Sequence, residues 1–220
     1  DAKHDKGKRE DARNWRKGMY DVYGRYIIEN YDAKPAFSDF LPAVAGIYGK
    51  PLWTFYVNRG QVITSFGVKS KDYPIMEFNS ANKAYQNTAL LGFRTFIKAT
   101  RNSQEFIVEP FSPTKTYYNG MPPDTFHSYP ARFMYVGQNE VQIREIDRIH
   151  RIETNVTYFS LPEEDFGALV RRTTITNLDQ QQSLELSVLD GLARIEPAGG
   201  RLDELLKNMG RTLEAWMGVY

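Results

Sequence analysis

Short segments in which polar and apolar side chains alternate recur along this chain from Leu52 to Ala193, separated by turn-forming residues such as Gly, Asn, Asp and Pro. The clearest is residues 169–176, LVRRTTIT, where β-branched residues are common. Alternation with a period of two buries one side of a strand and exposes the other, and it is typical of antiparallel sheets. Many such segments at short spacing predict a mainly β fold, an antiparallel β-sandwich.

Two tight hairpins are predicted in the first half of this pattern. The strand-like segments Leu52–Asn58 and Gln61–Val68 flank Arg59-Gly60, a typical turn. The segments Gly92–Ala99 and Glu105–Pro110 form a second pair around a polar turn. Longer strands are then predicted at Ala131–Gly137, Glu140–His150, Arg151–Leu161, Ala168–Asn177 and Ser183–Ala193.

Helical periodicity is found at the two ends of the chain. Residues Asp11 to Tyr31 repeat apolar side chains at three- and four-residue spacing, and Pro35 lies just beyond them. The predicted apolar face of this first helix comprises Trp15, Met19, Val22, Tyr23, Tyr26 and Ile27. A second apolar stripe comprises Leu202, Leu205, Leu206, Met209, Leu213, Trp216 and Met217.

These patterns divide the chain into three parts. We expect a tail with a helix at 1–35, a β-sandwich domain at 36–198 and the start of a helical linker at 199–220. A helix as apolar as the last one needs a surface to cover it. We therefore expect either that Tyr220 is not a natural C-terminus or that another chain packs on this helix.

Composition excludes several classes of function. The 220 residues include no cysteine, which rules out disulfides, thiolate metal sites and cysteine nucleophiles. The net charge of +1 gives no reason to expect nucleic acid or an anionic membrane surface as a partner. Neither a signal peptide nor an apolar run of about 18 residues is present, so we expect no membrane association and a cytoplasmic location.

The sequence contains no clear catalytic or metal-binding motif. Three histidines lack the paired spacing of zinc ligands and are interpreted as structural: His4, His127 and His150. Four isolated acids in strand-like segments are interpreted as surface or hydrogen-bonded structural groups: Glu77, Glu109, Asp147 and Asp190. The glycosylation sequon at Asn155 is interpreted as a chance match. We therefore assign no catalytic residue and no metal site to this chain.

The polar stretch Asn79–Asn87 is the most suggestive candidate for ligand binding. It combines donors, acceptors, a cation and an aromatic ring, and sugar hydroxyls and phosphate oxygens need that mixture. The alternative is a loop whose Asn and Ser side chains bind its own backbone. Arg59 and Arg94 also have two possible roles. Each could bind a phosphate or a carboxylate, or could be an ordinary surface charge. The predicted substrate-binding residues are Arg59, Asn82, Lys83, Tyr85, Gln86 and Arg94.

Three blocks of sequence resemble a known family. The first block is KPLW at 50–53, VNRGQ at 57–61 and SFG at 65–67. The second is KDYPIMEF at 71–78, NKAYQ at 82–86 and GFRTF at 92–96. The third is TYF at 157–159, LVRR at 169–172, ITN at 175–177, LDGL at 189–192, KNM at 207–209 and TLEAWM at 212–217. Together they resemble the N-terminal β-domain of inverting glycan phosphorylases related to cellobiose phosphorylase (glycoside hydrolase families 94, 149 and 161), and most of all β-1,3-glucan phosphorylases.

The resemblance implies a phosphorolytic reaction whose catalytic residue lies elsewhere. In this group a large β-sandwich (a supersandwich) precedes linker helices and an (α/α)6 barrel that holds the catalytic Asp, and that barrel is absent from these residues. A β-gluco-oligosaccharide and inorganic phosphate, the co-substrate, give α-glucose 1-phosphate and a shortened acceptor, with inversion and without a cofactor. The chain alone would be inactive and would act with its own C-terminal catalytic domain or a catalytic subunit.

The resemblance also implies how this part of a hexosyltransferase would contribute. Homodimers are common in the group, and the N-terminal domain of one protomer approaches the active site of the other. The polar stretch 79–87 and the long connection Phe111–Pro130 would then shape the acceptor end of the neighbouring cleft. Two alternatives stay open: a stand-alone carbohydrate-binding or interaction module, and a split enzyme in which the C-terminal apolar stripe binds a separate catalytic subunit.

Overall fold

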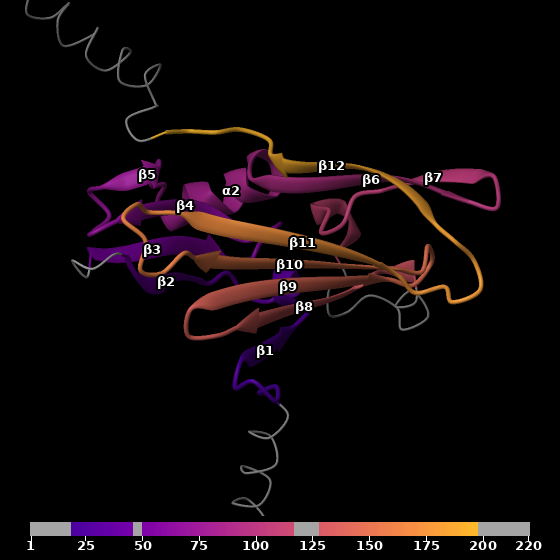
Figure 1. Ribbon diagram of the computed structural model, residues 1–220, viewed down its shortest axis with the longest axis horizontal. Coiled ribbons are helices and arrows are strands. Elements are labelled where there is room, and N and C mark those ends of the chain that lie inside the picture. Colours follow the sequence, from indigo (N-terminus) through magenta and orange to yellow (C-terminus); the bar gives the residue numbers. More distant parts are fainter. Residues whose placement is uncertain (1–18, 46–49, 117–127, 198–220) are drawn as a thin grey trace, which may run out of the picture.

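The computed structural model describes residues 19–45, 50–116 and 128–197, and in these residues the protein is mainly β (Figure 1). Three antiparallel sheets pack together, which confirms the predicted sandwich architecture. The strand orders are β1-β8-β9-β10-β11 in the five-stranded sheet, β2-β3-β4-β5 in the four-stranded sheet and β12-β6-β7 in the three-stranded sheet.

The strands of the five-stranded sheet are β1 (Tyr26–Glu29), β8 (Ala131–Val136), β9 (Glu140–Asp147), β10 (Ile152–Ser160) and β11 (Leu169–Asn177). Those of the four-stranded sheet are β2 (Ser38–Ala45), β3 (Lys50–Val57), β4 (Ile63–Val68) and β5 (Pro74–Met76). Those of the three-stranded sheet are β6 (Phe93–Arg101), β7 (Gln104–Val108) and β12 (Glu185–Leu192). The helices are α2 (Ala81–Leu91) and the short 3-10 helices η1 (Tyr31–Ala33) and η2 (Pro113–Lys115).

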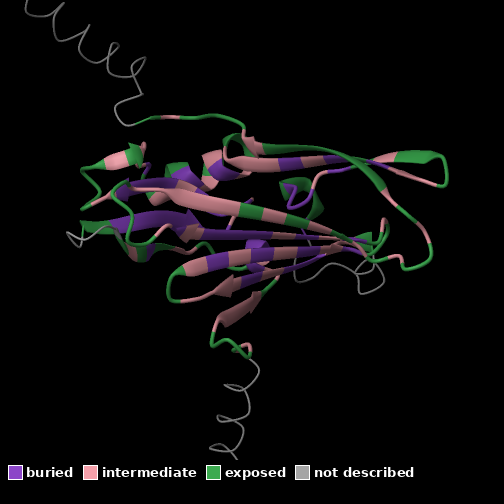
Figure 2. Ribbon diagram, viewed as in Figure 1, coloured by how far each residue is buried: buried purple, intermediate pink, exposed green. Residues whose placement is uncertain are grey.

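The four-stranded sheet is covered on both faces. On β3, Leu52, Thr54 and Tyr56 alternate with a second buried set that faces the other way. Tyr56 and Ile63 belong to the main core cluster with residues of β8, β9 and β10, so this face packs on the five-stranded sheet. The opposite set, Trp53, Phe55 and Val57, packs against α2 through Ala84 and Tyr85. Burial on both faces explains why β3 is a continuous apolar run (Figure 2).

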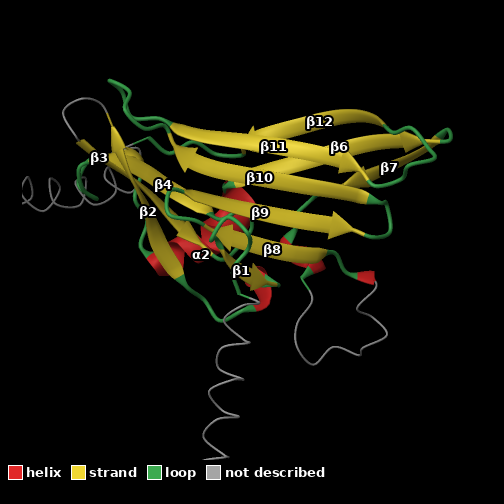
Figure 3. Ribbon diagram, turned by 60° about the horizontal axis from the view of Figure 1, so that its bottom comes forward, coloured by secondary structure: helices red, strands yellow, loops and turns green. Residues whose placement is uncertain are grey.

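The three-stranded sheet packs on the five-stranded sheet along a separate cluster. Ile97 of β6 and Val108 of β7 lie opposite each other in register, and both belong to one core cluster with Ile152 of β10. Figure 3 shows β12, β6 and β7 running close to β10 and β11. The other face of the three-stranded sheet points away from this core.

Both predicted hairpins are confirmed. Strands β3 and β4 pair antiparallel around Arg59-Gly60, and Gly60 has a φ of 52°, a conformation that glycine adopts without strain. Strands β6 and β7 pair around a turn at Asn102-Ser103. The later strands also form where the alternation predicts them, and each pairs with its neighbour along the chain from β8 to β11.

The helix predicted from Asp11 to Tyr31 is wrong over its described part, residues 19–31. Asp21 accepts hydrogen bonds from the backbone N–H groups of Tyr23 and Arg25, both at 2.9 Å, and Gly24 has a φ of 77°. These contacts make a turn, and the chain then enters β1, which pairs with β8. Local turn chemistry therefore overrides the helical spacing of the apolar residues. Residues 11–18 of the predicted helix lie outside the described residues.

The polar stretch Asn79–Asn87 is not a loop, because α2 begins at Ala81. The segment continues with strong helix formers, including Lys83, Ala84 and Gln86, and its buried side packs on β3. The predicted C-terminal helix at 202–217 and the middle of the long connection, 117–127, lie outside the described residues.

Candidate functional site

The predicted substrate-binding residues of α2 lie mostly in water. Asn82, Lys83 and Gln86 are exposed on the outer side of the helix, whereas Tyr85 is partly buried against β3. The guanidinium of Arg59 lies over the Tyr85 ring at 5.8 Å from its centroid. The structure therefore brings the β3–β4 turn and α2 together.

Arg59 also has a structural role at this turn. Its Nη1 donates to the Asn58 carbonyl at 2.7 Å, and its Nη2 donates to the Lys34 carbonyl at 3.2 Å. The neighbouring Asn58 is fully buried, and its side chain donates to the Tyr31 carbonyl and accepts from the Phe37 N–H. The motif around Arg59 thus ties η1 and the start of β2 to the hairpin.

Arg94 lies on a different surface from the other predicted residues. It is in β6, where its Nε and Nη2 donate to Glu109 Oε1 at 2.9 and 2.5 Å, and its guanidinium lies 4.7 Å from the Phe96 ring centroid. The six predicted residues therefore do not form one constellation. Their role in substrate binding stays a prediction.

A small cavity lies on the inner side of α2, between β4, β5 and the chain after β12. Asn79 and Asn87 of the polar stretch line it, together with Arg194 and Glu196, which form an ion pair at 2.7 Å. Its volume is about 50 Å³, which holds only a few water molecules. A sugar ring needs more space. This cavity is therefore a polar contact region between α2 and the neighbouring strands and not a substrate pocket.

The three sheets meet at a polar network around Arg171 of β11. Its guanidinium donates to both carboxylate oxygens of Asp190 in β12, with the Nη2–Oδ1 distance at 2.8 Å. It also donates to Gln61 Oε1 at 2.6 Å and, through Nε, to the Tyr158 hydroxyl at 3.2 Å. Thr95 of β6 completes this three-sheet network by donating to Asp190 Oδ1 at 2.6 Å.

The charges of the three-sheet network are fixed by its hydrogen bonds. Partial burial tends to raise the pKa of Asp190. The hydrogen bonds from Arg171, Thr95 and Thr173 and the positive charge of Arg171 outweigh burial, and they hold the pKa below its ordinary value of 3.8. Asp190 is therefore an ionised acceptor at neutral pH. An acid in that state holds Arg171 in place and has no proton to donate.

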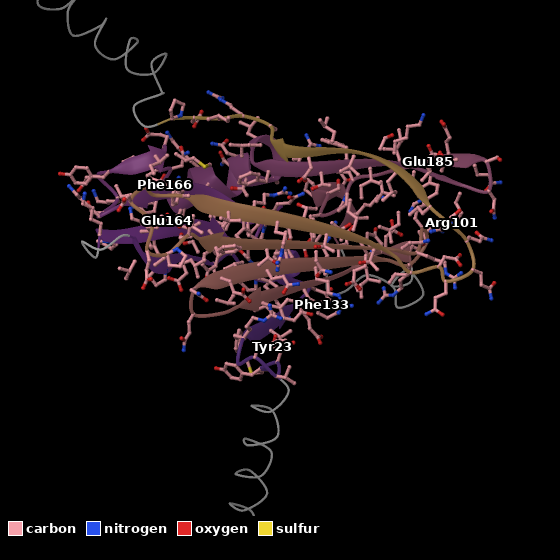
Figure 4. The ribbon with its side chains drawn as sticks, in the orientation of Figure 1. Tyr23, Arg101, Phe133, Glu164, Phe166 and Glu185 are labelled. Atoms are coloured by element: carbon pink, nitrogen blue, oxygen red, sulfur yellow. The ribbon has the colours of Figure 1, made fainter. Side chains whose placement is uncertain are left out.

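A second polar site is a groove on the outer face of the five-stranded sheet. Its volume is about 440 Å³, and Tyr23, 81% exposed, stands at its edge (Figure 4). We call it the sheet-face groove; its lining residues are Tyr23, Arg25, Glu140, Gln142, Asn155, Thr157, Arg172 and Thr174.

Hydrogen bonds order the floor of the sheet-face groove. Arg25 Nη1 donates to Glu140 at 2.9 Å and to Gln142 at 2.5 Å, and Gln142 Nε2 donates to Asn155 at 3.0 Å. Burial lowers the pKa of Arg25, but the hydrogen bonds that it donates to Asp21 and Glu140, and the charges of those two acids, outweigh burial and raise the pKa above its ordinary value. A fixed array of amides and charges beside an exposed aromatic ring can bind a polar ring-shaped ligand.

Only part of these two sites can be recognised from the sequence. Alternation in β10 and β11 indicates one wet face, and the sequon residues Asn155 and Thr157 lie on it. Asn155 is engaged with Gln142 and Glu153, as a structural side chain would be. Gln61 carried no such signal, because its partner Arg171 lies 110 residues away in the sequence.

The isolated acids and the described histidine have structural partners. Asp147 accepts from the backbone of Ile149 and from His150 Nδ1, each at 2.8 to 2.9 Å, and the His150 ring stacks on Phe106. Glu109 pairs with Arg94. Within the described residues, no group of three His, Asp or Glu side chains is placed to hold a metal ion. His4 and His127 lie outside those residues.

No helix of the described residues is both long and apolar enough to span a bilayer. No model of a known protein family matches the sequence, and no curated protein matches it.

Proposed function

We propose that this chain is the N-terminal β-domain of an inverting glycan phosphorylase. The complete enzyme would convert a β-gluco-oligosaccharide and inorganic phosphate into α-glucose 1-phosphate and a shortened acceptor. One observation carries the proposal: the three sequence blocks that resemble this family converge on the three-sheet network. Gln61 comes from the first block, Thr95 from the second, and Arg171 and Asp190 from the third.

This convergence supports a structural role for the chain. The residues of these blocks join three sheets through one largely buried arginine. Such a network specifies a scaffold, because each partner meets a geometric requirement of the others. The two most distinctive acids are unsuited to protonate a leaving sugar. Asp190 is ionised, and Glu145, only 3% exposed, is held by Arg132 and the Phe111 N–H. The catalytic acid would then come from a further domain or subunit.

The experiment uses the native polypeptide that contains this chain, with any subunit that copurifies. It is incubated with laminari- or cello-oligosaccharides and inorganic phosphate, and glucose 1-phosphate is measured. We expect release from one of the two series, with residues 1–220 alone giving none. Turnover by residues 1–220 alone would contradict the structural role, and the absence of release by the complete protein from both series would contradict the proposed reaction.

A second candidate function, a carbohydrate-binding module, is favoured by the sheet-face groove. Tyr23 offers a flat exposed ring, and the exposed guanidinium of Arg172 forms no ion pair or hydrogen bond with the described residues. An aromatic face beside ordered amides is the chemistry that recognises sugars. On this reading the groove would hold a gluco-oligosaccharide without cleaving it.

Titration calorimetry with laminari- and cello-oligosaccharides tests the second candidate. Binding that Tyr23→Ala weakens about tenfold would support it, because the stacking surface would be lost. The matched control is Tyr73→Ala, since Tyr73 is also exposed (54%) but lies at the β4–β5 turn. No heat with either series, or equal loss in both variants, would exclude the groove as a glycan site.

A further inference from the structure

One positive charge in the sheet-face groove has no partner among the described residues. Arg172 of β11 is exposed, and its guanidinium forms neither a hydrogen bond nor an ion pair with them. The other arginine of the lining, Arg25, is matched by two acids. Its Nε lies 2.7 Å from Asp21 Oδ2, and its Nη1 lies 2.9 Å from Glu140 Oε1. The groove therefore has a neutralised side at Arg25 and a cationic side at Arg172.

The register of the sheet places three different polar groups in one row across the groove. Gln142 of β9 lies opposite Thr157 of β10, which lies opposite Arg172 of β11. Neighbouring strands are about 4.8 Å apart, so this row extends over about 10 Å between its first and last backbone positions. An amide, a hydroxyl and a guanidinium thus follow one another along the groove. Figure 2 shows that exposed positions recur along β11.

The Thr157 hydroxyl in the middle of this row is also without a partner. Thr157 is only 7% exposed, and its side chain forms no hydrogen bond within the part of the chain that the structure describes. Burying a hydroxyl without a partner costs free energy, and most buried polar side chains are hydrogen-bonded. A hydroxyl and a guanidinium on adjacent strands are therefore available to bind a ligand.

The amides beside this row are held in fixed orientations. Arg25 Nη1 donates to Gln142 Oε1, Gln142 Nε2 donates to Asn155 Oδ1, and Asn155 Nδ2 donates to Glu153 Oε1 at 2.7 Å. A binding site that is ordered before the ligand arrives loses less conformational entropy on binding. The carboxylate of Glu140, which accepts a hydrogen bond from Arg25, has further acceptor capacity for ligand hydroxyls.

We propose that the sheet-face groove binds a sugar that carries one anionic group, a carboxylate or a phosphate. The anionic group pairs with the Arg172 guanidinium, whose planar fork fits two anionic oxygens. The sugar hydroxyls bond to Thr157 and to the amides of Gln142 and Asn155. The exposed ring of Tyr23, which lies beside the Arg25 guanidinium, bounds the opposite side of the groove.

The unpaired charge makes a neutral sugar the weaker ligand. A neutral ring placed over Arg172 removes water from the cation and supplies no opposite charge. A carboxylate or phosphate replaces that water with charge-assisted hydrogen bonds, which are about twice as strong as neutral ones. This inference rests on the groove being a sugar-binding site, as in the second candidate function, and it is independent of the proposed reaction.

Titration calorimetry on the native protein compares four small probes: glucose, glucuronate, glucose 6-phosphate and inorganic phosphate. Glucose 6-phosphate is neither substrate nor product of the proposed reaction. We expect glucuronate or glucose 6-phosphate to bind at least tenfold more tightly than glucose and inorganic phosphate, and the one that binds identifies the anionic group. Equal affinity for glucose or for inorganic phosphate, or no binding of either acidic sugar, would overturn the proposal.

The variant Arg172→Gln assigns the binding to the groove. Its matched control is Arg151→Gln, which removes the same charge from a side chain that is 60% exposed in the β9–β10 turn of the same sheet. We expect affinity for the acidic sugar to fall about tenfold in Arg172→Gln and to be unchanged in the control. Equal affinities in the two variants would contradict the proposal. Neutral oligosaccharides that bind as tightly as acidic ones would also contradict it, while leaving the second candidate function in place.

The side-chain amide signals of the protein give an independent readout by nuclear magnetic resonance. In a titration with the acidic sugar, we expect the signals of Gln142 and Asn155 to shift, because both line the groove. Asn82 and Gln86 are the controls, since they are exposed on α2, and their signals should not move. Shifts on α2 without shifts in the groove would show that the sugar binds elsewhere and would overturn the proposal.

Discussion

At the scale of the residue, Arg171 is the side chain on which the architecture depends most visibly. Its donors are all directed at acceptors from other elements, and its side chain is 9% exposed. The guanidinium also lies over the rings of Phe93 and Tyr158, at 5.1 and 5.8 Å from their centroids. An arginine is suited to this position because a planar fork can bond and stack at the same time.

We predict that Asp190→Asn reduces stability by about 2 kcal/mol at pH 7, since it weakens charge-assisted hydrogen bonds. The pKa of Asp190 in the folded protein lies below 3.8, so its contribution is present above about pH 4 and is lost as the pH falls through the folded pKa. Urea unfolding from pH 7 to pH 2 should therefore show the gap between wild type and variant closing below pH 4.

The control for this pH series is Asp72→Asn, because the Asp72 carboxylate is 68% exposed and pairs only with a neighbouring lysine. Its effect should be within about 0.5 kcal/mol at every pH. A gap for Asp190→Asn that stays constant from pH 7 to pH 2 would contradict the role given to the Arg171 contact.

Arg132 is a second buried arginine, and it joins η1, the chain after β7, and strands β8 and β9. Its Nε donates to Glu145 at 2.8 Å, its Nη1 donates to Asp32 at 2.5 Å, and its Nη2 donates to the Ser112 carbonyl at 2.8 Å. Burial raises the pKa of Glu145, although the charge of Arg132 and the hydrogen bonds from Arg132 and Phe111 oppose that rise.

Removing this cation should be costly. We predict that Arg132→Met lowers the free energy of unfolding by about 3–5 kcal/mol at pH 7, because two buried carboxylates lose their partner. The pKa of Glu145 should then rise further above 4.5, so the cost should shrink as the pH falls and the carboxyl takes up a proton. Arg151→Met, which removes a 60% exposed partner of Asp179, should cost less than about 1 kcal/mol. Equal losses in the two variants would argue against the buried cluster.

At the scale of the element, the β3–β4 hairpin and α2 are fitted to each other through Gly60. A Cβ built on Gly60 would lie 2.9 Å from the Cα of Ala89 and 3.1 Å from the Thr88 carbonyl oxygen. The Tyr31 hydroxyl also donates to the Gly60 carbonyl at 2.6 Å. The glycine is therefore required for its positive φ and for the close approach of the helix.

We predict that Gly60→Ala destabilises the protein by about 2–3 kcal/mol, from backbone strain and the displacement of α2. Gly24→Ala separates the two effects, since Gly24 also has a positive φ but no heavy atom within 4 Å of its Cβ position. It should cost only about 1 kcal/mol. The free energy of unfolding of both variants is measured by thermal or urea unfolding. An equal loss of stability would show that the close approach of α2 to Gly60 does not add to the loss in Gly60→Ala.

Strands and hairpin turns were predicted correctly from the sequence where local signals determine them. The β3–β4 hairpin with its glycine turn was predicted, because alternation and turn chemistry are both local signals. The stretch at α2 was predicted to be a loop because Asn and Ser favour turns. It forms a helix because its alanines favour helical structure and its buried side packs on the apolar face of β3. The turn at Asp21 was missed because aromatic residues happened to recur at helical spacing.

At the scale of the whole molecule, the sites could not be read from the sequence because their residues are remote along the chain. Arg171 and Gln61 are 110 positions apart, and Arg25 and Gln142 are 117 apart. Sheet order, which no local pattern specifies, brings each pair together. The predicted set of six substrate-binding residues was likewise divided between two surfaces by that order.

The central claim concerns the reaction of the complete protein, and the anomeric form of its product tests that claim most directly. A β-gluco-oligosaccharide is incubated with inorganic phosphate and the native polypeptide that contains this chain, and the product is followed by nuclear magnetic resonance. A phosphorylase of the inverting type forms α-glucose 1-phosphate, in amounts that require phosphate. We expect that result; glucose released without phosphate, or β-glucose 1-phosphate, would contradict the account.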